Sequence, residues 1–76
     1  MWYYDSPVGR ISIVQTPKGL YGMKHNGVIW ETCDTPQAEA DNVFQQFTGC
    51  PAWDVYQLSN EEMLHVPQNL DEWIRE

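Results

Sequence analysis

Cysteine, histidine and carboxylate side chains are the groups in this chain that could do chemistry, and their spacing decides which chemistry. The two cysteines and two histidines, Cys33, Cys50, His25 and His65, are scattered, with no C-x-x-C or H-x-x-x-H motif among them. Metal sites that can be recognised in a sequence place such ligands a few residues apart. The spacing therefore predicts no metal site, and we expect no bound cofactor.

A cysteine nucleophile needs surroundings that stabilise its thiolate. Cys50 is expected to follow the C-terminus of a helix, which is the wrong end for a negative charge. Cys33 precedes a helix N-terminus, but Glu31 and Asp34 lie beside it and oppose its ionisation. The chain also lacks a phosphate-binding glycine loop and a G-x-S-x-G motif. We predict no catalytic residues, and a small cysteine-dependent redox protein remains a remote alternative.

The carboxylates are concentrated in the second half of the chain. Residues 1–30 contain three basic residues against one acidic residue, and residues 31–76 contain one against ten, so the halves carry +2 and −9 and the chain −7. Such a surface repels phosphate backbones and attracts basic partners, although small domains also use net charge for solubility alone. The carboxylates predicted to contact a partner are Glu39, Asp41, Glu61, Glu62, Asp71 and Glu72.

Tryptophan is the other unusual feature of the composition, with Trp2, Trp30, Trp53 and Trp73 in one short chain. Each indole has on the order of 200 Å² of surface and an N–H group that needs a partner. A core of this size does not easily bury four of them, and exposed tryptophans are typical of interfaces. We assign Trp53 and Trp73 to the candidate partner-binding surface; the alternative is that they cover the edges of the core.

The strands are predicted in the first half. Residues 10–15 and 20–25 have the composition of strands, and Asn26-Gly27 then predicts a two-residue type I′ turn into a third strand over residues 28–33. Such a turn fixes the register of the hairpin. The predicted opposing pairs are His25 with Val28, Met23 with Trp30, and Tyr21 with Thr32.

A helix of about 12 residues is predicted to follow, because Thr35 can cap it and Pro36 suits its first position. Its apolar residues recur with helical spacing, and Gly49 lies just past its expected end. We expect this helix to cover the sheet face that carries Tyr21, Met23 and Trp30. The residues of its apolar stripe are Ala40, Val43, Phe44 and Phe47.

The remaining residues predict a short fourth strand over 53–58 and two short helical turns. Ser59 and Glu62 have the spacing of a capping box, and Asn69 can cap the last turn. The chain is therefore expected to be a single α+β domain, residues 1–76. It is predicted to have a three-stranded antiparallel sheet with one amphipathic helix packed across it, plus a short fourth strand or helical C-terminal tail. No apolar run of about 18 residues and no signal peptide is found, so we expect a cytoplasmic protein without membrane contact.

Five short segments resemble a group of small, functionally uncharacterised bacterial proteins. They are Ser6-Pro7-Val8-Gly9, "TPQAEADNVF" at 35–44, Thr48-Gly49, Trp53-Asp54 and "LDEW" at 70–73. More distantly, three strands followed by such a helix are similar to AP2/integrase-type DNA-binding domains. That resemblance implies nucleic-acid recognition by the sheet face, with Arg10, Lys18 and Lys24 at the candidate positions.

From these features we expect a non-enzymatic protein-interaction module that binds a basic protein partner. A sharper form of the hypothesis is an acidic inhibitor or nucleic-acid mimic of bacterial or phage type, whose carboxylates occupy a groove built for phosphates. The alternative is nucleic-acid binding through the weakly basic N-terminal sheet, which the net charge of −7 disfavours. The sequence carries no signal for the oligomeric state.

Overall fold

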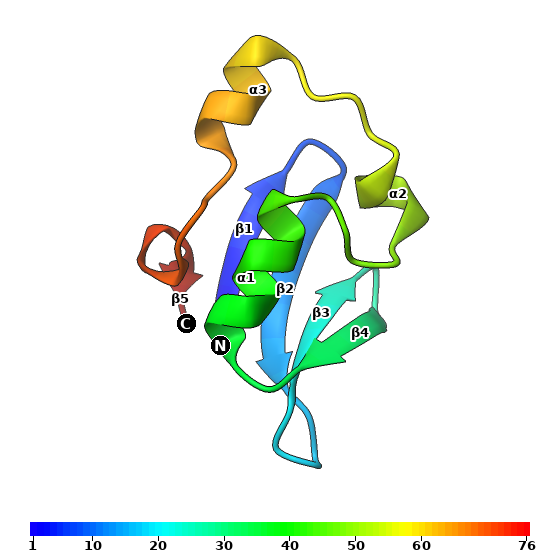
Figure 1. Cartoon of the computed structure of the whole chain (residues 1–76), viewed down its shortest axis with the longest axis vertical. Helices are drawn as coiled ribbons and strands as arrows, with labels where there is room; N and C mark the ends of the chain where they lie inside the picture. The colour runs from blue at the N-terminus through cyan, green and yellow to red at the C-terminus, as the bar shows by residue number, and fades with distance from the viewer.

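The computed structural model describes all residues, 1–76, and consists of a five-stranded antiparallel sheet with its helices on one face (Figure 1). The strand order is β4-β3-β2-β1-β5. The strands are β1 (Trp2–Ser6), β2 (Gly9–Gln15), β3 (Tyr21–His25), β4 (Val28–Cys33) and β5 (Ile74–Arg75). The helices are α1 (Pro36–Phe44), α2 (Pro51–Asp54), α3 (Asn60–His65) and the 3₁₀ turn η1 (Leu70–Glu72). The predicted α+β class is confirmed, but the sheet has two strands more than predicted.

Both additional strands lie at the ends of the chain. β1 pairs with β2, and β5 pairs with β1 through Trp2 opposite Arg75 and Tyr3 opposite Ile74.

The fourth strand predicted over residues 53–58 is wrong, because Pro51 starts the short helix α2 there. Proline fixes φ at a helical value and needs no hydrogen-bond acceptor at the first helical position, so it favours this turn.

The β3–β4 hairpin turns as predicted but then changes register. Asn26 and Gly27 both have positive φ, and His25 pairs with Val28. The ladder shifts between Lys24 and Met23, so that Met23 lies opposite Glu31 rather than opposite Trp30. Trp30 is thus the extra residue of a β-bulge.

The bulge decides which side chains face the helix. Tyr21 pairs with Cys33 instead of Thr32, so Glu31 and Cys33 share the face of Met23. On the opposite face Ile29 lies over Gly22, where a Cβ atom would come within 2.7 Å of the isoleucine side chain. A glycine in β3 therefore makes room for the displaced strand.

Helix α1 lies across the sheet and contacts β2, β3 and β4 (Figure 1). It ends at Phe44, three residues earlier than predicted, because Gln46 takes a left-handed conformation with φ of 54°. The amides of Gln46 and Phe47 then bond back to Val43 and Asn42, which is a Schellman ending. The side-chain Nε2 of Gln46 donates to the carbonyl oxygens of Trp53 and Tyr56 at 2.8 and 2.7 Å, which compensates for a conformation that glycine usually adopts.

The cap of α1 is the predicted one, and it can be tested. The Thr35 hydroxyl accepts a hydrogen bond from the amide of Ala38 at 3.1 Å. Thr35→Ala should lower the free energy of unfolding by roughly 1 kcal/mol, since it leaves that amide without its acceptor. Urea denaturation measures the change, and Thr35→Ser is the control that keeps the acceptor. Equal losses in both variants would mean that the hydroxyl is not the group that matters.

The core lies between the sheet and α1, with α2 and the C-terminal segment closing its edges. Its nine buried apolar residues are Ile11, Ile13, Met23, Ala40, Val43, Cys50, Trp53, Val66 and Trp73. Helix α3 projects from the body of the molecule above β1 and α1 (Figure 1). At nine residues, α1 is the longest helix, so none is long enough to cross a bilayer.

Candidate functional site

Four of the six carboxylates predicted to contact a partner are exposed, and three of these four cap no helical turn. Asp41 is on α1, Glu61 on α3 and Asp71 on η1. Only Asp41 of these three has a hydrogen bond to another side chain, which the Nε2 of Gln37 donates at 2.8 Å. These carboxylates can therefore meet a partner without breaking the fold.

Two further predicted carboxylates act as local caps. Glu62 accepts from the Ser59 amide and from the Tyr56 hydroxyl, both at 2.9 Å, and completes the predicted capping box of α3. These hydrogen bonds, the backbone one first, lower the pKa of Glu62 below its usual value. Glu72 accepts from the Asn69 amide at 2.9 Å in the same way. Charge reversal at either position would loosen a helical turn as well as change the surface.

The assignment of Trp53 and Trp73 to the partner surface is wrong, because both are buried. Trp53 has no exposed surface, and its Nε1 donates to the Val43 carbonyl at 2.8 Å. Tyr4 packs edge-on against both indoles, with ring centroids 6.0 and 5.9 Å away. The structure shows the alternative arrangement, in which these two indoles cover the edges of the core. The exposed tryptophan is Trp30, at the bulge.

The assignment of Glu39 to the surface is also wrong, since its side chain is fully buried beneath α1. The stripe of α1 that faces the sheet begins earlier than predicted and runs through Pro36, Glu39, Ala40 and Val43. These four positions also have the i, i+3, i+4, i+7 spacing, which is the sequence signal that could have found Glu39.

Glu39 meets two residues that the bulge turns inward. The ligand atoms of Glu31, Cys33 and Glu39 all lie within 4.8 Å of one another. From the next turn of α1, the Nδ2 of Asn42 donates to Glu31 at 3.0 Å and approaches the Cys33 sulfur at 3.3 Å. Both carboxylate oxygens of Glu39 are buried without a hydrogen-bond partner. We refer to Glu31, Cys33, Glu39 and Asn42 as the buried cluster.

The electrostatics of the buried cluster favour its protonated forms. Burial, followed by the Glu31 carboxylate, raises the pKa of Glu39 from 4.5 to about 8. Burial and the same neighbouring carboxylates raise the pKa of the Cys33 thiol to about 12. A thiol with so high a pKa stays protonated at neutral pH and is a weak nucleophile.

The second cysteine lies apart from this cluster. Cys50 is fully buried, precedes α2 instead of following a helix, and lies with its sulfur 3.7 Å from the Nδ1 of His25. The Nε2 of His25 bonds to the Val8 carbonyl at 2.8 Å. Neither cysteine forms a disulfide. A sulfur without exposed surface has no access to a substrate, so this pair contributes to packing.

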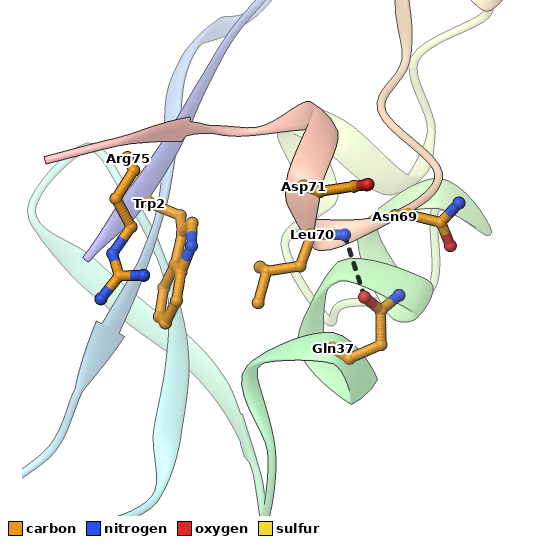
Figure 2. A pocket seen from close by; sticks show the side chains of 6 residues that line it. All are labelled: Trp2, Gln37, Asn69, Leu70, Asp71 and Arg75. Carbon is orange, nitrogen blue, oxygen red and sulfur yellow. Dashed lines mark hydrogen bonds between the residues drawn. The ribbon is translucent and has the colours of Figure 1, made fainter.

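The largest hollow of the surface, about 500 Å³, lies where the two ends of the chain meet (Figure 2). Arg75 stacks on Trp2 on one side, with its guanidinium carbon 4.6 Å from the ring centroid. On the other side Gln37 accepts a hydrogen bond from the Leu70 amide at 2.9 Å, which fastens the C-terminal turn to α1. Asp71 is the only carboxylate that lines this hollow.

A smaller hollow of about 210 Å³ lies between the end of α1 and α3. Four apolar side chains and one amide line it. These residues, which we call the α1–α3 groove, are Phe44, Gln46, Leu58, Met63 and Val66. Phe44 was predicted to lie in the core, but the early end of α1 leaves it 42% exposed.

Comparison with known proteins provides no relative from which a function could be inferred: no family model, no curated protein and no solved structure matches this chain.

Proposed function

We propose that this protein is a non-enzymatic interaction module that binds a basic protein partner. The observation that carries the proposal is the apolar surface around the α1–α3 groove. Phe44 and Met63 line that groove and are 42% and 57% exposed, and Leu64 on the same short helix is 84% exposed. Exposed apolar side chains that line a groove are typical of surfaces that a partner covers.

Charge determines the kind of partner. Asp41 is exposed one helical turn before Phe44, and Glu61 is exposed on α3. The chain as a whole carries −7. A basic segment with apolar residues on one side complements this combination, because its cations would meet the carboxylates while its apolar side chains enter the groove. An acidic inhibitor or nucleic-acid mimic is the more specific form of this module.

The open face of the sheet gives less support to nucleic-acid binding. Arg10 is paired with Asp5 at 2.8 Å and stacks on Tyr3. Of the other two candidate positions, Lys24 lies on β3 and Lys18 lies in the turn between β2 and β3, so the strands present one free lysine on this face. Each phosphate contact to a duplex needs a free cation that can release counterions. The redox alternative is equally weakly supported, since one thiol is buried and the pKa of the other, Cys33, is raised to about 12.

Titration with a synthetic amphipathic peptide of lysine and leucine tests the proposal. We expect amide chemical-shift changes centred on the α1–α3 groove, and binding that weakens between 20 mM and 150 mM salt, over which the screening length falls to about 8 Å. Met63→Ser and Glu61→Lys should each weaken binding several-fold. Val55→Ser is the matched control, because Val55 is 76% exposed but does not line the groove.

Two results would contradict this function. One is peptide binding that is indifferent to salt and to both groove variants. The other is binding of duplex DNA at 150 mM salt that is lost in Lys24→Ala, which would make the open sheet face the functional surface.

Glu61 is a better site for charge reversal than Glu62, whose carboxylate completes the cap of α3.

A further inference from the structure

The buried cluster contains more acceptors than donors. Asn42 provides the only side-chain N–H group that reaches Glu31 and Cys33, and the only side-chain donor that faces Glu39 is the weak S–H group of Cys33. No lysine or arginine compensates for the two carboxylates, since the one salt bridge of the protein joins Arg10 and Asp5. Either a proton shared by the carboxyl groups or a metal cation would balance these acceptors.

Glu39 provides an independent indication of a ligand. Its side chain has no exposed surface, neither of its oxygens accepts a hydrogen bond from an N–H or O–H group, and one oxygen lies within 4.8 Å of ligand atoms of Glu31 and Cys33. Burying an unpaired carboxyl group is costly, so buried polar atoms are almost always satisfied by hydrogen bonds or by a bound ion.

The donor atoms indicate the class of ion. Two carboxylate oxygens and one sulfur suit zinc or a similar transition metal, whereas magnesium and calcium prefer oxygen alone. Zinc bonds of about 2.0–2.3 Å place tetrahedral ligand atoms roughly 3.5 Å apart. The three atoms lie within 4.8 Å of one another, so small side-chain rotations bring them into range.

We propose that Glu31, Cys33 and Glu39 form a binding site for one zinc-class divalent metal ion, which joins β4 to α1. Glu31 and Cys33 are only partly buried, so the ion can enter from their side. Three protein ligands leave a fourth position, which water or the side-chain oxygen of Asn42 fills once that amide rotates. Coordination displaces the thiol proton of Cys33, and any proton on Glu39, into the solvent.

Cobalt serves as the spectroscopic probe, because a cobalt–thiolate bond gives a charge-transfer band in the near ultraviolet. The whole, tag-free chain, freed of metal with a chelator and then dialysed, should develop this band with a 1:1 endpoint. Zinc should abolish the band by competition and raise the melting temperature relative to the chelated protein.

The variants separate the cluster from adventitious metal binding. Cys33→Ser should remove the charge-transfer band, and Glu39→Gln, which keeps the shape of the side chain, should weaken zinc binding at least about tenfold by calorimetry. Cys50→Ala is the matched thiol control and Asp34→Asn the matched carboxylate control; both should bind as the unmodified chain does. Circular dichroism checks that each variant is folded.

Any one of three outcomes overturns the proposal. They are the absence of a 1:1 cobalt or zinc complex, a charge-transfer band that survives Cys33→Ser, or zinc affinity that is unchanged in Glu39→Gln. If no metal binds while Glu39→Gln is folded, the cluster is a pair of carboxyl groups that share a proton.

Discussion

Replacing Trp53 with alanine should lower the free energy of unfolding by about 3–5 kcal/mol. The indole is fully buried, packs edge-on against Tyr4 and donates a hydrogen bond to the Val43 carbonyl. Truncation removes apolar contacts, leaves a cavity at the junction of α1 and α2, and leaves the Val43 carbonyl with only the Gln46 amide as its donor. A chain of this length buries only about 60% of its unfolded surface, so such a loss can unfold it at 25 °C.

Phe44→Ala is the matched aromatic control, and it should cost only about 1 kcal/mol, since that ring is 42% exposed in the α1–α3 groove. Chemical denaturation of both variants, followed by far-UV circular dichroism, measures the difference. A larger loss for Phe44 than for Trp53 would restore the predicted apolar stripe of α1 and contradict the early end of this helix.

The second large effect is a pH-dependent gain in stability for Glu39→Gln. The unfolded chain loses the Glu39 proton near pH 4.5, whereas the folded chain holds it up to about pH 8, the raised pKa of Glu39. Between these values the folded state binds more protons, so the stability of the unmodified chain falls as pH rises. Glutamine has no proton to lose, so Glu39→Gln should become the more stable form as the pH rises, by an amount on the order of a few kcal/mol at pH 8.5.

Urea denaturation at pH 5 and pH 8.5, with a chelator present, measures this difference. The two proteins should be close in stability at pH 5 and diverge at pH 8.5. Asp41→Asn removes an exposed carboxylate from the same helix and should follow the unmodified chain at both pH values. Parallel stability curves for Glu39→Gln and the unmodified chain would show that the carboxyl group is not held in its protonated form.

The features that were predictable from the sequence depend on neighbours in the chain. The turn at Asn26-Gly27, the cap at Thr35 and the capping box of Ser59 and Glu62 each need only three or four consecutive residues. Such motifs satisfy their own hydrogen bonds, so they form wherever the chain allows them.

The features that were missed depend on distant residues. β5 forms only because β1, at the other end of the chain, offers it an edge to pair with. The end of α1 is set by Gln46, whose left-handed conformation is stabilised by carbonyl groups seven and ten residues later in the chain. The buried cluster needs the register shift in β4 as well as the position of Glu39 on α1, and the register shift cannot be derived from local spacing.

The bulge at Trp30 also has a consequence for self-association. β4 is an outer strand of the sheet, and Val28, Ile29 and Trp30 on it are exposed. A regular, apolar outer strand is a template on which a second chain can add its own strand and start aggregation. The extra residue interrupts the row of free amide and carbonyl groups, so an incoming strand cannot pair along the whole edge. At the other edge β5 has only two residues. Neither edge of the sheet therefore offers an incoming strand a long, regular row of free amide and carbonyl groups.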